Sequence, residues 1–284
     1  KGEIMEKAIK RYFPIFVLPT MIAFTLGFII PFAEGVYLSF CKFTTVNDAK
    51  FIGLSNYGKV FKDSTFVHAF WYTAAFTVVS VILINVLAFA VALLLTKGIK
   101  GTNLFRTVFF MPNLIGGIVL GYIWQLLLNG ILMKFSRTLT YSSTFGFWGL
   151  VILMCWQQIG YMMIIYIAGI QNIPGELIEA AEIDGATKRQ VLKSVTIPMV
   201  MPSITVCTFL TLTNSFKLFD QNLALTNGEP SKMSEMLALN IFTTFYGRAG
   251  YEGVGQAKAV IFFILVAAIA LTQNYLTRRK EVQQ

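Results

Sequence analysis

Six long windows of this chain contain no Asp, Glu, Lys or Arg, and no other feature constrains its fold as strongly. Each window is at least 19 residues long and predominantly apolar. About 20 apolar residues, at a rise of about 1.5 Å per residue, form a helix that crosses a hydrocarbon core about 30 Å thick. The sequence therefore predicts six membrane-spanning helices. The windows are residues 12–33, 64–96, 107–133, 138–175, 194–216 and 259–277.

The composition supports an all-α membrane protein, because 56% of the residues are hydrophobic and only 13% are charged. A water-soluble fold of 284 residues would not keep that many apolar side chains away from water. The basic residues Lys7, Lys10 and Arg11 precede the first window as they would in a secretory signal. That window is longer than the apolar part of a typical signal and no small-residue cleavage site follows it. We expect it to be a retained helix.

The distribution of Lys and Arg predicts the orientation, since positive residues concentrate on the cytoplasmic side. The terminal segments and alternate connections hold 13 Lys and Arg in 51 residues, whereas the other connections hold 10 in 95. Both termini are therefore predicted to be cytoplasmic, and a basic cytoplasmic rim accounts for the net charge of +9 without a nucleic-acid partner. The predicted order is a cytoplasmic N-terminus (1–11), a first span (12–33), an extracytoplasmic loop (34–69), a core of five spans (70–277) and a cytoplasmic C-terminus (278–284).

The sequence contains no constellation typical of an enzyme. His68 is the only histidine and sits at the predicted outer side, where a loop or interfacial role is the simpler interpretation. Gly53, Gly58 and Lys59 imitate a nucleotide-binding loop, but Val60 replaces the hydroxyl residue that holds Mg²⁺. The three cysteines are far apart in the chain. We expect no catalytic, cofactor-binding or metal-binding site.

Transport driven by an ion gradient is an alternative for a protein with six spans. Ion-coupled carriers usually keep charged side chains or histidines inside the bilayer as relays or ion ligands. The six windows contain only uncharged polar groups such as Asn85, Gln125 and Asn214. These groups bind hydroxyl-rich ligands but do not relay protons, so we expect the energy for transport to come from another subunit.

The segment 173–198, between the fourth and fifth windows, is longer than a simple connection needs, since about 2–8 residues suffice. Its pattern predicts two short helices separated at Gly185: acidic Glu176 and Glu179 suit the first turns, and basic Lys188 follows the break. One interpretation is an amphipathic helix on the membrane surface. Anionic cytoplasmic lipids would repel its acidic first half, so a protein partner is the better match.

The run Glu179-Ala180-Ala181, followed by Gly185 and by Val195-x-Ile197-Pro198, resembles the EAA signature of ABC importer permeases, with Val and Ile in place of the usual Ile and Leu. The resemblance extends over nearly the whole chain and points to the sugar-uptake branch, which includes maltose and multiple-sugar permeases. Three segments carry this wider resemblance. An outer-loop motif of the branch is similar to Phe51-Ile52-Gly53-Leu54-Ser55-Asn56-Tyr57, and its third span is similar to Phe105-Arg106-Thr107 with Pro112 and Trp124. A turn of the branch is similar to Leu225-Thr226-Asn227-Gly228-Glu229-Pro230, although it usually has Gly at position 229.

The resemblance implies a type I ABC importer permease fold in a bacterial plasma membrane, surrounded by lipid. It also implies a second permease subunit, different but related, together with two ATP-hydrolysing subunits and an extracytoplasmic sugar-binding protein. By analogy with the family, the loop 171–198 docks on an ATP-hydrolysing subunit. The residues expected to carry that contact are Glu179, Ala180, Ala181, Asp184 and Gly185.

A sugar offers hydroxyl groups and apolar ring faces, so its path needs uncharged polar groups beside aromatic surface. Helical spacing selects two sets of candidates, Gln157, Gln158 and Tyr161 in the fourth window and Thr211, Asn214 and Ser215 in the fifth. The same side chains would also serve to bond neighbouring helices together. A permease for glycerol phosphate or a polyol is a further alternative, since Lys217 lies just beyond the fifth window and would suit a phosphate.

Overall fold

The computed structural model describes residues 2–278, and these residues are mostly helical. Among them, five helices are long and apolar enough to cross a membrane, and a bent pair gives a sixth if it counts as one span. The five are Tyr12–Leu38, Ser64–Leu95, Gly117–Phe135, Ser143–Gln171 and Glu252–Arg278, and the bent pair is Lys188–Met199 with Met201–Phe216. The prediction of a largely helical chain with about six apolar spans is confirmed. The predicted C-terminal segment 278–284 lies outside the described residues apart from Arg278.

The chain divides into two compact units, which we describe separately. The first contains the residues up to 62 together with 241–261. It begins with α1 (Gly2–Phe24), a π-helical turn (Thr25–Ile29) and α2 (Ile30–Leu38). From Tyr12 to Leu38 the large apolar side chains are mostly exposed. Strands β1 (Cys41–Lys42) and β2 (Lys50–Phe51) pair antiparallel, and α3 (Ser55–Lys62) follows.

A buried asparagine holds this small region together. The Asn56 amide donates to the carbonyl oxygens of Ser39 and Cys41 at 2.9 and 2.8 Å. Gly253, near the start of α14 (Glu252–Arg278), lies so close to the Cys41 carbonyl that a Cβ would overlap it. These contacts join the two strands and α3 to the start of α14.

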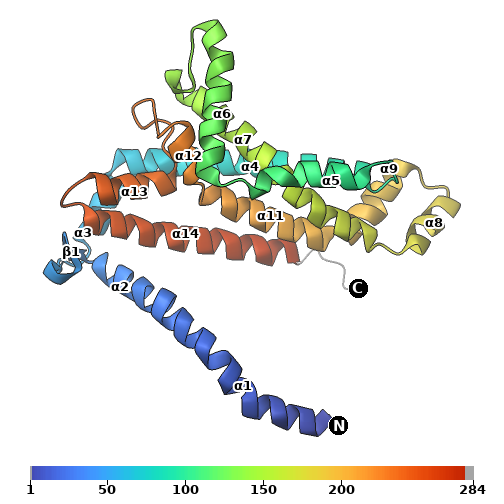
Figure 1. Ribbon diagram of the computed structural model, residues 1–284, viewed down its shortest axis with the longest axis horizontal. Coiled ribbons are helices and arrows are strands. Elements are labelled where there is room, and N and C mark those ends of the chain that lie inside the picture. The colour runs from blue at the N-terminus through green and yellow to red at the C-terminus, as the bar shows by residue number, and fades with distance from the viewer. Residues whose placement is uncertain (1, 279–284) are drawn as a thin grey trace. The chain divides into compact units, whose positions relative to one another are not determined.

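The second unit contains residues 63–240 and 262 onwards. Its centre is α4 (Ser64–Leu95), α7 (Ser143–Gln171) and α11 (Met201–Phe216), which pack on one another around a continuous apolar core. Helix α5 (Thr102–Phe110) packs on α7, and α6 (Gly117–Leu132) packs on α12 (Asp220–Leu225). The short helices α8 (Gly175–Ile183) and α9 (Lys188–Val191) lie at one end, and α13 (Leu237–Gly247) begins in this unit (Figure 1).

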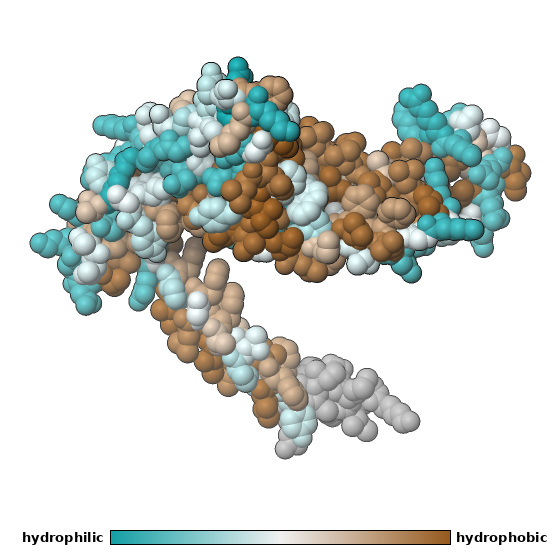
Figure 2. Space-filling model, turned by 45° about the horizontal axis from the view of Figure 1, so that its top comes forward, coloured by the Kyte–Doolittle hydropathy of each residue, from teal (hydrophilic) through white to brown (hydrophobic). Residues whose placement is uncertain are grey.

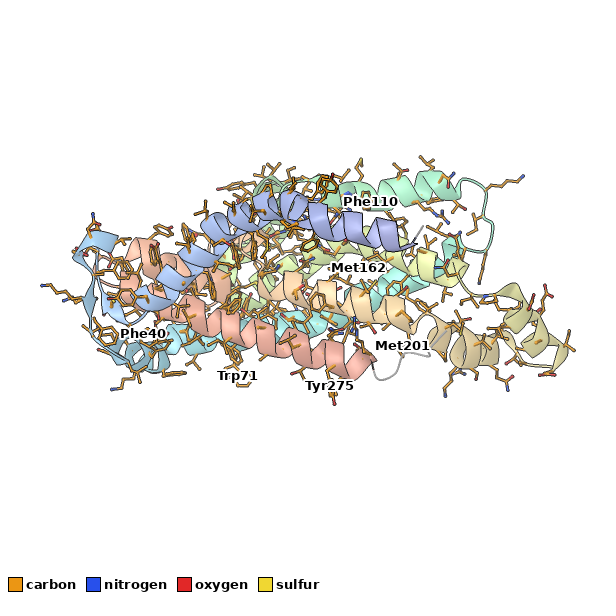
Figure 3. The ribbon with its side chains drawn as sticks, turned by 90° about the horizontal axis from the view of Figure 1, so that it is seen from below. Phe40, Trp71, Phe110, Met162, Met201 and Tyr275 are labelled. Atoms are coloured by element: carbon orange, nitrogen blue, oxygen red, sulfur yellow. The ribbon has the colours of Figure 1, made fainter. Side chains whose placement is uncertain are left out.

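The surface of the second unit matches a membrane environment. Figure 2 shows hydrophobic side chains along the helices and hydrophilic side chains gathered at the end that carries α8 and α9. Trp71 and Tyr275 project outward from their helices, whereas Met162 of α7 is fully buried (Figure 3). Water would disfavour so much exposed apolar surface, so lipid or another protein covers it.

The predicted span 107–133 is not one continuous helix. Helix α5 ends at Phe110, a 3₁₀ turn (Met111–Leu114) follows, and Ile115 and Gly116 have extended backbones before α6 begins. Pro112 supplies the physical reason, because proline has no N–H to donate and disrupts a helix interior. The apolar count was correct, but it does not register a break in the backbone.

The fifth span is also interrupted. A π-helical turn (Leu192–Thr196) leads from α9 into α10 (Ile197–Met199), and the helix axes on either side of Val200 meet at 68°. In a regular helix the backbone N–H of residue 202 would donate to the Pro198 carbonyl oxygen. Pro202 has no N–H, so this hydrogen bond is missing and the helix bends.

Replacing Gly160 with Ala should destabilise the second unit. A Cβ at Gly160 of α7 would overlap the Phe109 carbonyl oxygen of α5 and stand 2.8 Å from the Phe110 nitrogen. Since overpacking of this kind costs about 1–3 kcal/mol, we expect Gly160→Ala to lower the melting temperature of the purified protein by several degrees. Gly130→Ala in α6 is the control, because nothing lies within 4 Å of its Cβ position. Equal melting temperatures for the two variants would contradict this account of the α5–α7 contact.

Candidate functional site

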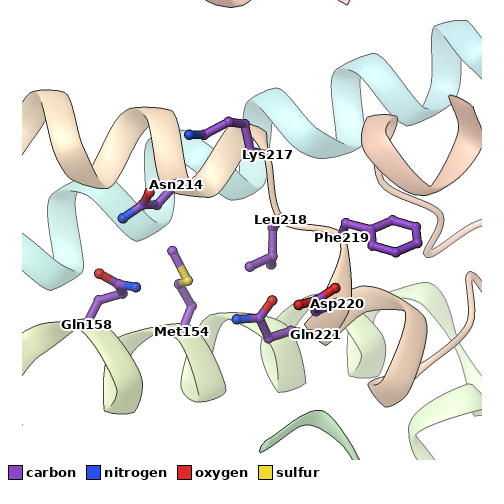
Figure 4. Close-up of a pocket in the computed structure, with 8 residues that line it drawn as sticks. All are labelled: Met154, Gln158, Asn214, Lys217, Leu218, Phe219, Asp220 and Gln221. Carbon is purple, nitrogen blue, oxygen red and sulfur yellow. The ribbon is translucent and has the colours of Figure 1, made fainter. Parts of the chain in front are cut away.

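A cavity of about 290 Å³ lies where α7, α11 and α12 meet. Three amide side chains line it, Gln158 from α7, Asn214 from α11 and Gln221 from α12 (Figure 4). Apolar surface comes from Met154, Leu218 and Phe219, and the charged residues Lys217 and Asp220 complete the lining. The volume is at the lower end of the roughly 300–1,000 Å³ of small-molecule pockets, so the cavity suits a small ligand or one segment of a longer ligand.

Gln158 has the most informative side chain of the site. It is 8% exposed, and its Oε1 atom accepts no hydrogen bond from any residue between 2 and 278. Its amide and that of Asn214 point toward one another across the cavity (Figure 4). Buried amide oxygens are normally paired, so an unpaired one in a cavity wall suggests a ligand that donates a hydrogen bond.

Gln157 does not line the cavity but orients a residue that does. Its Oε1 accepts a hydrogen bond from Gln221 Nε2 at 2.8 Å, and its Nε2 donates to the Ile115 carbonyl oxygen at 3.4 Å. Because the Gln221 nitrogen is bound to Gln157, the Gln221 oxygen remains available as an acceptor toward the cavity.

The other predicted path residues lie around the cavity rather than in its wall. Thr211 is fully buried, donates to the Cys207 carbonyl oxygen at 2.7 Å and accepts from Asn85 Nδ2 at 3.3 Å. Ser215 is also fully buried, and its hydroxyl has no partner in the described part of the chain. The ring of Tyr161 is half-buried and lies 6.3 Å from that of Phe110 on α5.

Asp220 and Gln221 were not predicted from the sequence, and Lys217 was noted only as a neighbour of the fifth window. Lys217 is the charged residue that ends the fifth window, and Asp220 and Gln221 follow it closely in the sequence. A usable signal was present, since Lys, Asp and Gln occur within five residues directly after an apolar helix that carries Asn214. If the chain turns back after this helix, the side chains that follow the helix lie near its C-terminal end.

The loop between α7 and α11 has the two short helices that the sequence predicts. Gly185 separates them and has a φ of +80°, which L-residues with side chains rarely adopt. Thr187 begins α9 with a capping box, in which its side chain and that of Gln190 bond each other's backbone N–H. The break is thus built into the backbone by a glycine and a cap.

The predicted docking residues of this loop are accessible. Glu179, Ala180, Asp184 and Gly185 are exposed and Ala181 is half-buried. The sequence did not single out Ile183, which is 86% exposed at the end of α8. Within residues 2–278 no three His, Cys, Asp or Glu side chains lie together as a metal site would require.

Comparisons with known proteins agree on one family. The family model described as binding-protein-dependent transport system inner membrane component matches residues 95–282. The chain is 43% identical to the probable starch degradation products transport system permease protein AmyD of Thermoanaerobacterium thermosulfurigenes, over 95% of this chain and 94% of that protein. It is 28% identical to the multiple sugar-binding transport system permease protein MsmF of Streptococcus mutans, over 98% of this chain and 99% of that protein.

Among solved structures, a chain of a bacterial ABC transporter involved in the import of the acidic polysaccharide alginate has a similar fold. The TM-score is 0.80 at 21% sequence identity, and the match covers 97% of this chain and 98% of that one. At this identity the likeness concerns the fold alone.

Replacing Tyr166 with Phe should test whether the Asn85 network holds helices together. The Tyr166 hydroxyl donates to Asn85 Oδ1 at 2.7 Å, and Asn85 in turn donates to Thr211. Its loss should destabilise the protein by about 1 kcal/mol and reduce the melting temperature, with transport per folded molecule unchanged. Tyr122→Phe on the exposed face of α6 is the control. A stable Tyr166→Phe variant with reduced transport would instead place the network in the transport path.

Proposed function

The chain belongs to the family of binding-protein-dependent transport system inner membrane components, and from this premise we propose that it forms the translocation path of an ATP-driven sugar importer. The cargo that we propose is an uncharged oligosaccharide. The observation that carries the assignment is the cavity of three amides and apolar side chains, in a chain 43% identical to a permease named for starch degradation products.

The chemistry of the cavity fits a sugar. A hydroxyl group both donates and accepts hydrogen bonds, so the hydroxyls of a sugar are able to donate to Gln158 Oε1 and to accept from Asn214 Nδ2. A phosphate at pH 7 mainly accepts, and would leave the Gln158 oxygen unpaired. Met154, Leu218 and Phe219 supply the apolar surface on which a sugar ring rests.

The coupling contact that we propose is the exposed surface of α8 and the turn after it. Ile183 would enter an apolar depression of an ATP-hydrolysing subunit, while Glu179 and Asp184 pair with its polar rim. Gly185 would permit the close backbone approach. ATP binding in that subunit then moves the loop, and the loop moves α11 through the bend at Val200.

The remaining subunits follow from the family. We propose a related second permease, two ATP-hydrolysing subunits and an extracytoplasmic sugar-binding protein, with both termini of this chain cytoplasmic. The apolar side chains of α1 and α2 would lie against lipid and the second permease. This chain would transport without hydrolysing ATP.

A permease for glycerol phosphate is the second candidate, because Lys217 does line the cavity. Asp220 lines the same cavity, however, and its carboxylate would oppose a phosphate. The pair of opposite charges favours the uncharged cargo.

Replacing Gly185 with Ala should uncouple the transporter. The substitution forces alanine into a left-handed backbone conformation, which costs about 1–2 kcal/mol of conformational free energy, and it places a methyl group at the proposed contact. We expect normal membrane insertion with loss of sugar-stimulated ATPase activity in the reconstituted complex. Gly98→Ala is the matched control, since Gly98 has a φ of +74° and open space around it, in a different connection. Normal stimulation in Gly185→Ala would remove the coupling assignment.

Replacing Gln158 with Met or Asn214 with Leu should reduce sugar uptake by about tenfold per residue, because each removes a hydrogen bond to the cargo. Basal ATPase activity and subunit assembly should persist. Thr213→Val on α11 is the control, because the Thr213 hydroxyl bonds only its own helix. Uptake is measured per assembled complex in proteoliposomes. Variants that fail to assemble, with unchanged uptake per complex, would show that these amides serve packing and not cargo.

A further inference from the structure

Two residues of opposite charge in one short segment line the cavity. Lys217 is the residue at the C-terminal end of α11, and Asp220 is the first residue of α12. Both line the cavity with the three amides (Figure 4). Among residues 12–278, whose side chains the structure describes, neither forms an ion pair with the other or with a third side chain. The cavity therefore presents two separate charges whose sum is zero.

The carboxylate of Asp220 lies beside the start of α6. Its Oδ2 atom lies 3.1 Å from the point where a Cβ of Gly117 would stand, and Gly117 is the first residue of α6. The N-terminal end of a helix carries a partial positive charge that stabilises a carboxylate nearby. With glycine at position 117, the carboxylate approaches this helix end without steric hindrance.

The two charges act differently on neutral and anionic ligands. Sugar hydroxyls satisfy both groups, since one hydroxyl accepts from the Lys217 ammonium and another donates to the Asp220 carboxylate. An anion gains from Lys217 and loses to Asp220 by a similar amount. At an effective dielectric constant near 20, one unit charge about 5 Å away changes affinity on the order of 100-fold. The carboxylate thus cancels the advantage that the lysine alone would give to an anion.

We propose that Asp220 is a specificity-determining residue that excludes anionic sugars, and that Lys217 and Asp220 each bind a hydroxyl of a neutral one. The proposal rests on the proposed function, and it assigns the charge of the cargo to two residues of this chain. The alginate transporter shows that a similar fold occurs in an importer of an acidic polysaccharide. The fold therefore leaves the charge of the cargo open, and side chains of the cavity must decide it.

A simpler role for Asp220 is to join α12 to the start of α6. The two roles differ in what they affect. A joining role changes stability and the affinity for every ligand together. A charge filter changes the ratio between a neutral ligand and its anionic counterpart. The ratio is therefore the quantity to measure.

The experiment measures binding to the purified complete complex without its sugar-binding protein, which would otherwise select the cargo first. The probes are maltotriose and maltotriose oxidised at one C6 to a carboxylate. For the wild type we expect the carboxylated sugar to bind at least about tenfold more weakly, because the two charges of the cavity cancel and the sugar carboxylate still loses its hydration on binding. Asp220→Asn should reduce that ratio by about tenfold or more, and Asp220→Glu should retain it. Lys217→Met should increase the ratio, and the double variant Lys217→Met/Asp220→Asn should return it close to the wild-type value.

The outcomes separate the two proposals. If the wild type binds neither probe, the sugar assignment fails and the charge filter fails with it. If the wild type binds maltotriose but Asp220→Asn keeps the wild-type ratio, only the charge filter is overturned. Should Asp220→Asn fail to assemble, Lys217→Met decides, because an unchanged ratio in that variant equally overturns the filter.

Discussion

Hydrogen bonding between uncharged side chains is the constraint on which the helix core depends. Charged groups are expensive in a membrane interior, so the contacts among α4, α7 and α11 use amides and hydroxyls instead. Asn85 illustrates this, because its amide joins Tyr166 of α7 to Thr211 of α11. The same chemistry lines the cavity. A paired amide holds helices together, whereas the Gln158 oxygen has no partner among the described side chains.

The spans and the coupling loop were predictable because both leave a linear signal. An apolar window without charge has no alternative to a buried or membrane-spanning helix, and a glycine between two amphipathic segments marks a turn. The breaks inside spans were not predicted. Pro112 interrupts the third window and Pro202 bends the fifth, yet hydropathy treats both as ordinary members of an apolar run. A hydropathy score measures only how apolar each side chain is, so it does not register the backbone N–H that proline lacks.

The cavity was only half predictable, for a geometric reason. Spacing places Thr211 and Ser215 on one face of α11 and Asn214 beside them, but it does not say which face meets other helices. In the structure the first two are fully buried and Asn214 reaches the cavity. The opposite wall comes from α12, whose position depends on the close approach of Gly117 and Gly121 of α6. A contact between helices about 100 residues apart in sequence has no local signature.

The bend at Val200 changes how a displacement passes through the molecule. A straight helix between the loop and the cavity would transmit a push along its own axis. With the axes at 68°, the segment before Val200 would act instead as a short lever arm on α11. Val200 is fully buried, so the bend would be the point about which the two segments turn. A small sideways shift of α9 would then rotate the far end of α11, where Asn214 and Lys217 lie, across the cavity.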